Sequence, residues 1–313
     1  MPLFTYGLQT DNIIYLFQGG DVMLVLFTDT DCDITPQVAQ HYGYKLISMP
    51  YIVDGKETRP YEDFQTFNAH EFYQQLRDGV LPQTCALSPA DYVAYFEPYF
   101  ANGDDILYVH FSSAMSGTFN AMNLAIAELK QKYTKTKFYT IDTKAITILS
   151  CLIAKEVGEM YLRGCTAEQM VEWAKEQVDH YAVFFYADNL KFFAKSGRVS
   201  NLTATMGNLL GIHPILHMDT NGTMQTLTKG QGSTGTLKKI VAYVEEYQEN
   251  IASHPVIIGH ADCLPLAQKL ANMLKQKFGQ DLPIEFVDVN PTAGSHCGPD
   301  TTGVAFHAKR RHS

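Results

Sequence analysis

Hydroxyl side chains in residues 112–121 (SSAMSGTFNA) could bind an anion. A short apolar run ends there in serines and a glycine, just before a segment rich in Ala, Met and Leu. We expect Ser116, Gly117 and Thr118 at or near the N-terminus of a helix, where unpaired N–H groups and the helix macrodipole favour a carboxylate or phosphate. A serine that only caps the helix, with no ligand, would produce the same pattern.

A second hydroxyl cluster lies in residues 83–89 (QTCALSP), before another segment with helical periodicity. Ser88 and Pro89 are typical of an N-cap and of the first position of a helix. Thr84 is therefore the member of this cluster that we predict to donate a hydrogen bond to an anion. Neither hydroxyl segment contains Lys or Arg, so we expect neutral donors to hold the anion.

Three other chemistries are disfavoured by the sequence around their motifs. Residues 230–235 match G-x-G-x-x-G, but the strand before them is expected to be the second arm of a hairpin, which does not fit a dinucleotide site. The chain has 11 histidines, yet no predicted helix carries a His-x-x-x-His pair beside a carboxylate, so we predict no metal site. No G-x-S-x-G motif is present. Cys297 adjoins His296, but adjacent side chains seldom face each other productively, so we predict no catalytic residues.

Short apolar runs alternate with stretches of helical period from Val22 onward, which predicts strands interleaved with crossover helices. The runs at 22–27, 106–111 and 137–141 each end in small polar residues. In an open parallel sheet the ligand crevice lies beyond the carboxyl ends of the strands, so these polar residues point toward one site. Plain helix capping remains an equal explanation for them.

The second half of the chain has a different pattern. A hairpin is predicted at 212–228, helices at about 236–249 and 263–278, and strands at 255–260 and 283–289. The fold class we predict is therefore α/β with two domains. An N-terminal three-layer α/β/α domain with a parallel sheet would span 22–180, and a C-terminal α/β domain with a mixed sheet would span 181–313. Residues 1–21 are predicted to be an N-terminal extension.

Composition narrows the range of partners. The 313 residues carry 24 Lys and Arg against 33 Asp and Glu, a net charge of −9 that makes nucleic acid a poor partner. Six scattered cysteines and no recognisable secretory leader predict reduced thiols in the cytoplasm. No apolar run approaches the roughly 20 residues that a membrane-spanning helix needs.

Five motifs in order resemble those of the bacterial DegV family of fatty-acid-binding proteins, over about residues 22–306. The family's Asp-Ser-Thr-Cys-Asp is similar to residues 28–33 (TDTDCD), and its Thr-Ser-Gln-Pro is matched in part by residues 84–87. Its Ser-Gly-Thr helix start resembles residues 116–118. Its Lys-Gly-Gly-Arg-Ile and His-Thr-Gly-Pro-Gly resemble residues 195–199 and 296–300.

The resemblance implies one long-chain fatty acid held between the two domains, with its tail in an apolar tunnel of the C-terminal domain. It implies that Thr84, Ser116 and Gly117 bind the carboxylate and that His296 is a polar neighbour of the head group. Arg198 would lie at a partner or phosphoryl-transfer surface. Asp300 would place a negative charge near the head group.

The resemblance also implies a lipid-carrying subunit of a fatty acid kinase, which presents the carboxylate to a separate ATP-binding subunit. No cofactor and no complete catalytic set are expected, and contact with a membrane would be transient and at its surface. The alternative is a stand-alone enzyme that acts on a small phosphorylated or carboxylated metabolite at the ends of the strands.

Overall fold

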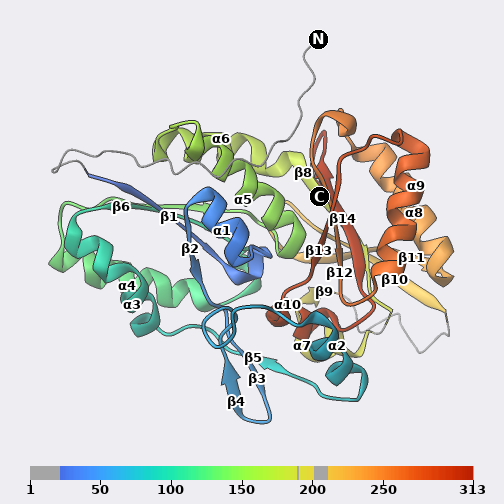
Figure 1. Cartoon of the computed structure of the whole chain (residues 1–313), viewed down its shortest axis with the longest axis horizontal. Coiled ribbons are helices and arrows are strands. Elements are labelled where there is room, and N and C mark those ends of the chain that lie inside the picture. The colour runs from blue at the N-terminus through green and yellow to red at the C-terminus, as the bar shows by residue number, and fades with distance from the viewer. Residues whose placement is uncertain (1–21, 189, 201–210, 313) are drawn as a thin grey trace.

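The structure is a computed structural model that describes residues 22–188, 190–200 and 211–312. The predicted extension at residues 1–21 lies outside these ranges. Figure 1 shows one sheet on the left of the molecule and a larger sheet on the right, with helices packed around and between them.

The first sheet is parallel and has the strand order β2-β1-β6-β7. It consists of β1 (Leu24–Asp29), β2 (Tyr44–Ile47), β6 (Asp105–His110) and β7 (Phe138–Asp142). Helices α3 (Pro89–Asn102) and α4 (Thr118–Lys132) pack together on one face. Helices α1 (Pro36–Tyr42), α5 (Thr147–Leu162) and α6 (Ala167–Gln177) lie on the other (Figure 1). The predicted three-layer arrangement with a parallel sheet is therefore confirmed.

The second sheet is mixed and has the order β13-β12-β14-β8-β10-β11-β9. Its strands are β8 (Tyr181–Tyr186), β9 (Val199–Ser200), β10 (Ile212–Met218), β11 (Met224–Gln231), β12 (Val256–His260), β13 (Ile284–Asp288) and β14 (Thr302–His307). The predicted hairpin is the antiparallel pair β10–β11. Helices α8 (Gly232–Tyr247) and α9 (Leu264–Phe278) both contact this sheet. The glycine motif at 230–235 thus follows a hairpin arm, as expected.

Several short elements were not predicted from the sequence. A small antiparallel sheet joins β3 (Tyr51–Val53), β4 (Lys56–Thr58) and β5 (Gln83–Thr84). Helices α2 (Ala69–Arg77), α7 (Lys191–Ser196) and α10 (Pro291–Cys297) are also short. Four single-turn 3₁₀ helices are present in the described residues, at Thr30–Cys32, Ser113–Met115, Val178–His180 and Ile251–Ser253. Strands of two or three residues carry too little periodicity to stand out in a sequence.

Helix α5 joins the two sheets into one core. Its residues 148–154 are all buried, and it contacts β6 of the first sheet as well as β8, β12 and β14 of the second. A helix that is largely apolar all around its axis is stable only where other parts of the protein cover it on every side. The first sheet and the small β4-β3-β5 sheet use the strands up to β7, and the second sheet uses those from β8 onward. The domain boundary near residue 180 stays a prediction.

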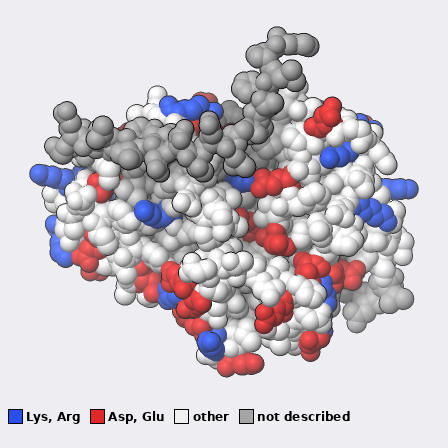
Figure 2. Space-filling view, viewed as in Figure 1, with Lys and Arg blue, Asp and Glu red and all other residues white. Residues whose placement is uncertain are grey.

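Charged side chains are mixed over the face seen in Figure 2. Asp and Glu are distributed over much of that face, with Lys and Arg scattered among them. Within the described ranges, no helix is both long and apolar enough to span a bilayer.

Candidate functional site

A cavity lies where the first turn of α5, the second sheet, α10 and the end of β1 come together. Its atom-free space, together with open solvent at its mouth, amounts to about 980 Å³. Most of its wall is apolar, and the apolar lining includes Phe111, Met115, Ile148, Val183, Phe185, Met218 and Met224. Polar side chains also face it: Asp31, Thr84, Ser116, Arg198 and His296. The cavity can therefore take a molecule with a long apolar part and a polar end.

Two glycines form part of the cavity wall on neighbouring strands of the second sheet. Gly259 and Gly303 are paired across β12 and β14. A Cβ on Gly259 would lie 2.6 Å from Ile148 Cγ2, and one on Gly303 would lie 2.2 Å from Phe185 Cβ. Both distances are far below van der Waals contact, so α5 and β8 approach this wall as closely as glycine allows.

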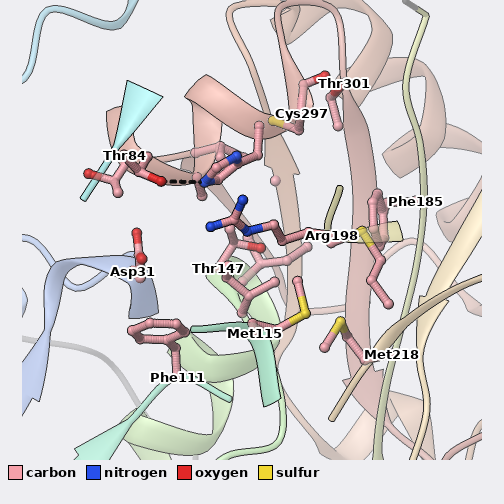
Figure 3. A pocket seen from close by; sticks show the side chains of 18 of the residues that line it. Asp31, Thr84, Phe111, Met115, Thr147, Phe185, Arg198, Met218, Cys297 and Thr301 are labelled. Atoms are coloured by element: carbon pink, nitrogen blue, oxygen red, sulfur yellow. Dashed lines mark hydrogen bonds between the residues drawn. The ribbon is translucent and has the colours of Figure 1, made fainter. Parts of the chain in front are cut away.

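Thr84 and His296 form a hydrogen-bonded pair at the cavity (Figure 3). Thr84 is the last residue of β5, and His296 lies in α10, whose N-cap Asn290 accepts a hydrogen bond from Ala293 N. The distance between Thr84 Oγ1 and His296 Nε2 is 2.9 Å. Burial, together with the positive charge of Arg198, lowers the pKa of His296 to about 4. The imidazole is therefore neutral at pH 7.

The N-terminus of α4 lies beside the cavity, as the sequence predicts. Gly117 is the N-cap and has no side chain to cap the helix, and Ser116 Oγ accepts a hydrogen bond from Thr118 N at 3.2 Å. Thr118 Oγ1 in turn lies 3.1 Å from Leu87 N, which links the two hydroxyl segments. Ser116 and Thr118 line the cavity, whereas Gly117 is not among the described residues that do so. Thr84, Ser116 and His296 are thus brought to one cavity.

Other polar residues at the strand ends have structural roles. Ser112 Oγ donates to Gly222 O at 2.7 Å and accepts from Ala114 N, so it ties the end of β6 to the β10–β11 turn. Ser113 Oγ donates to Asp142 at 2.5 Å. Ser112 is therefore a helix cap, whereas Ser113 links the end of β6 to Asp142 at the end of β7.

A cluster of three buried acids begins at the last residue of β1, and none of the three was predicted as a binding residue, although the polar residues at this strand end were expected to point toward one site. Asp29 Oδ2 accepts hydrogen bonds from Tyr108 OH at 3.0 Å and Phe111 N at 3.2 Å. Asp33 Oδ1 accepts from the backbone and side-chain nitrogens of Asn290, at 2.9 and 2.7 Å. Burial raises the pKa of Asp29 and of Asp33 to about 7. The sequence did contain a signal for this cluster, because an acid occupies every second position in residues 28–33.

Arg198 lines the same cavity as Thr84 and Ser116. It follows α7, whose C-cap Gly197 has φ +66°, and its Nη1 donates to Ser196 O at 2.5 Å. A cation therefore lines the cavity together with the neutral donors, and the prediction that neutral donors hold the head group stays a prediction. Asp300 is not among the described lining residues, because it pairs with Arg77 at 2.8 Å. Its expected position near the head group stays a prediction.

Comparisons with known proteins agree with this architecture. A DegV domain-containing protein from Clostridium perfringens is 29% identical over 283 residues, which are 90% of this chain and 96% of the relative. The crystal structure of a stearic-acid-binding protein from Eubacterium ventriosum has a TM-score of 0.80 at 18% identity, covering 92% of this chain and 99% of that one. A fatty-acid-binding DegV family protein from Streptococcus agalactiae has a TM-score of 0.78 at 22% identity, covering 93% of this chain and all of that one. The family model described as "Uncharacterised protein, DegV family" matches residues 23–309, and the chain therefore belongs to the DegV family.

Proposed function

We propose that this protein binds one long-chain fatty acid in the cavity, with the carboxylate at Thr84, Ser116 and His296 and the tail along the apolar wall. The observation that carries the proposal is a single cavity with an apolar lining and these polar groups. The Eubacterium ventriosum and Streptococcus agalactiae proteins, described as fatty-acid-binding, share the fold and support this assignment.

The two parts of the site contribute differently to affinity. Burying about 15 methylenes at roughly 0.8 kcal/mol each is worth about 12 kcal/mol before the costs of association. A pair of hydrogen bonds from hydroxyls to a carboxylate adds about 3–6 kcal/mol. The tail therefore supplies most of the affinity, and the polar end fixes where the carboxylate lies.

We further propose that the protein is the lipid-carrying subunit of a cytoplasmic fatty acid kinase. A carboxylate oxygen of the bound lipid would attack the γ-phosphorus of ATP held by a separate subunit, giving an acyl phosphate and releasing ADP. Arg198 is exposed and lines the cavity, and in this proposal it would face the incoming phosphates. Ser116 and Thr84 would hold the carboxylate without an ion pair and leave it nucleophilic.

Lipid extraction from the purified protein tests fatty acid binding. Mass spectrometry should find close to one fatty acid per chain, and a polar metabolite that the protein turns over would support the stand-alone enzyme instead. The kinase role is tested by adding ATP and the ATP-binding subunit encoded in the same genome, and by trapping acyl phosphate with hydroxylamine. Product should require both proteins, and no product with a loaded, folded chain would refute the kinase role.

A further inference from the structure

Asp31 is a buried carboxyl that faces the cavity with one unpaired oxygen. It is 6% exposed, it lines the cavity, and its Oδ1 has no hydrogen-bond partner. Figure 3 shows its carboxyl pointing toward the hydrogen-bonded pair that Thr84 forms with His296, and the Arg198 guanidinium reaches into the same part of the cavity. An unpaired buried polar atom is costly, so a ligand atom is the natural partner for it.

The surroundings of Asp31 disfavour its ionised form. Asp29 and Asp33 flank it in the chain, and burial together with their charges raises the pKa of Asp31 well above its ordinary value. His296 is neutral, and Arg198, the cation that lines the cavity among the described residues, is largely exposed and screened by solvent. Cys32 and Cys85 are the neighbouring thiols, and burial raises the pKa of both. Burial and the neighbouring acids therefore favour the protonated form of Asp31.

We propose that Asp31 is a further head-group residue, whose protonated carboxyl donates a hydrogen bond to the fatty acid carboxylate. One proton is then shared between two carboxyl groups, and no bond other than this hydrogen bond forms or breaks. This inference rests on the proposed fatty acid binding. Asp31 would then be a third donor to the ligand carboxylate, beside the hydroxyls of Thr84 and Ser116, and its hydrogen bond would be charge-assisted.

A protonated Asp31 favours long-chain ligands that end in a carboxylate and disfavours ligands that end in a cation. An ionised Asp31 would instead repel a carboxylate and attract an alkylamine of the same length. The two protonation states thus predict opposite ligand preferences.

The test uses the delipidated full chain with myristate and tetradecylamine as probes. Asp31→Asn keeps a donor and should bind myristate within about threefold of the wild type, whereas Asp31→Ala should bind it at least tenfold more weakly. Asp281→Asn, at an exposed aspartate, is the matched control. Tighter binding of myristate by either Asp31 variant, or a wild type that prefers the amine, would overturn the proposal.

Infrared difference spectroscopy of the wild-type complex at pH 7 tests the same proposal even if an Asp31 variant fails to fold. Because Asp29 and Asp33 also hold protons near pH 7, the band of Asp31 is the part of the protonated-carboxyl stretch that Asp31→Asn lacks and that carboxyl-labelled ¹³C-myristate shifts. Absence of that band from a myristate-loaded wild type would refute the role of Asp31 and leave fatty acid binding intact. Failure of the wild type to bind myristate at all would count against the proposed function itself.

Discussion

Thr84 and His296 are 212 positions apart in the chain, yet Thr84 Oγ1 lies 2.9 Å from His296 Nε2. Thr84 is held by the pairing of β5 with β3, and His296 by the short helix α10. The pair is therefore built from two elements that the fold brings together, and it marks the polar end of the cavity.

Removing the two hydroxyls should weaken fatty acid binding without unfolding the protein. For Thr84→Val combined with Ser116→Ala we expect a loss of about 3 kcal/mol, roughly two orders of magnitude in affinity, because both variants delete donors to a charged group. Displacement of a fluorescent fatty acid measures the affinity, and circular dichroism checks folding. Ser253→Ala, at an exposed serine, is the control. Unchanged affinity in the double variant would remove the head-group role of both residues.

The pKa of His296 should be lowered by the burial of its side chain. By NMR we expect its pKa near 4 instead of 6.5, and Arg198→Gln should raise that pKa because a neighbouring positive charge is lost. Since the unfolded chain takes up the proton more readily, His296 makes the protein less stable as the pH falls from 6.5 toward 4. His296→Gln should flatten that part of the stability profile. A pKa near 6.5 in the folded protein would contradict the burial of this side chain.

Filling the apolar wall should change the preferred tail length. Val183→Phe places a larger side chain at the cavity, so stearate should lose more affinity than laurate. The added bulk also costs about 1–3 kcal/mol of folding free energy, which thermal melting will show. Val183→Ala enlarges the cavity at the same position and should keep its affinity for stearate. Equal losses for both acids in a folded Val183→Phe protein would mean that the tail does not reach this wall.

Arg198 should matter for phosphoryl transfer more than for lipid retention. Arg198→Gln should reduce acyl phosphate formation by about tenfold or more, because a cation facing the transferring group is lost. Its fatty acid affinity should change by no more than about threefold, since this side chain is exposed. Lys195→Gln, at the exposed lysine nearby, is the control for net charge. A large loss of affinity would show instead that Arg198 binds the carboxylate directly.

Asp29 should destabilise the protein as the pH rises. Its pKa is raised from 3.8 to about 7, so the folded state holds the proton that the unfolded state releases, and stability is lost as the pH rises through 7. Asp29→Asn should therefore stabilise the fold by on the order of 2 kcal/mol more at pH 8 than at pH 5. Urea unfolding at the two pH values measures the difference, with Asp281→Asn as the exposed control. The same effect at both pH values would mean that Asp29 is ionised throughout.

The sequence was sufficient for the large elements and for part of the site. Long apolar runs predict β1, β6 and β7, and a serine-glycine-threonine helix start predicts the position of Ser116 at α4. Strand periodicity and helix-start chemistry are local properties, so they can be read from neighbouring residues.

The contacts that complete the site depend on the fold. Asp31 looks like any polar residue after a strand until the surrounding structure buries it and leaves one oxygen unpaired. Arg198 lies in an exposed segment, and only the packing of α7 against α10 brings it to the cavity. Burial and long-range proximity follow from the whole chain, which is why the role of Asp31 was not apparent in the sequence and the role of Arg198 was predicted only from the family resemblance.

The glycine wall limits how this protein can diversify. A side chain added at Gly303 would collide with the backbone of β8, and one added at Gly259 would collide with the side chain of Ile148, so we expect both positions to resist substitution. Methionines occupy other parts of the lining, at positions 115, 218 and 224, and their unbranched side chains accommodate changes of shape at little energetic cost. Substitutions at the methionine positions are therefore the easiest way to change the length of ligand that the cavity accepts, whereas we expect the glycines to stay unchanged.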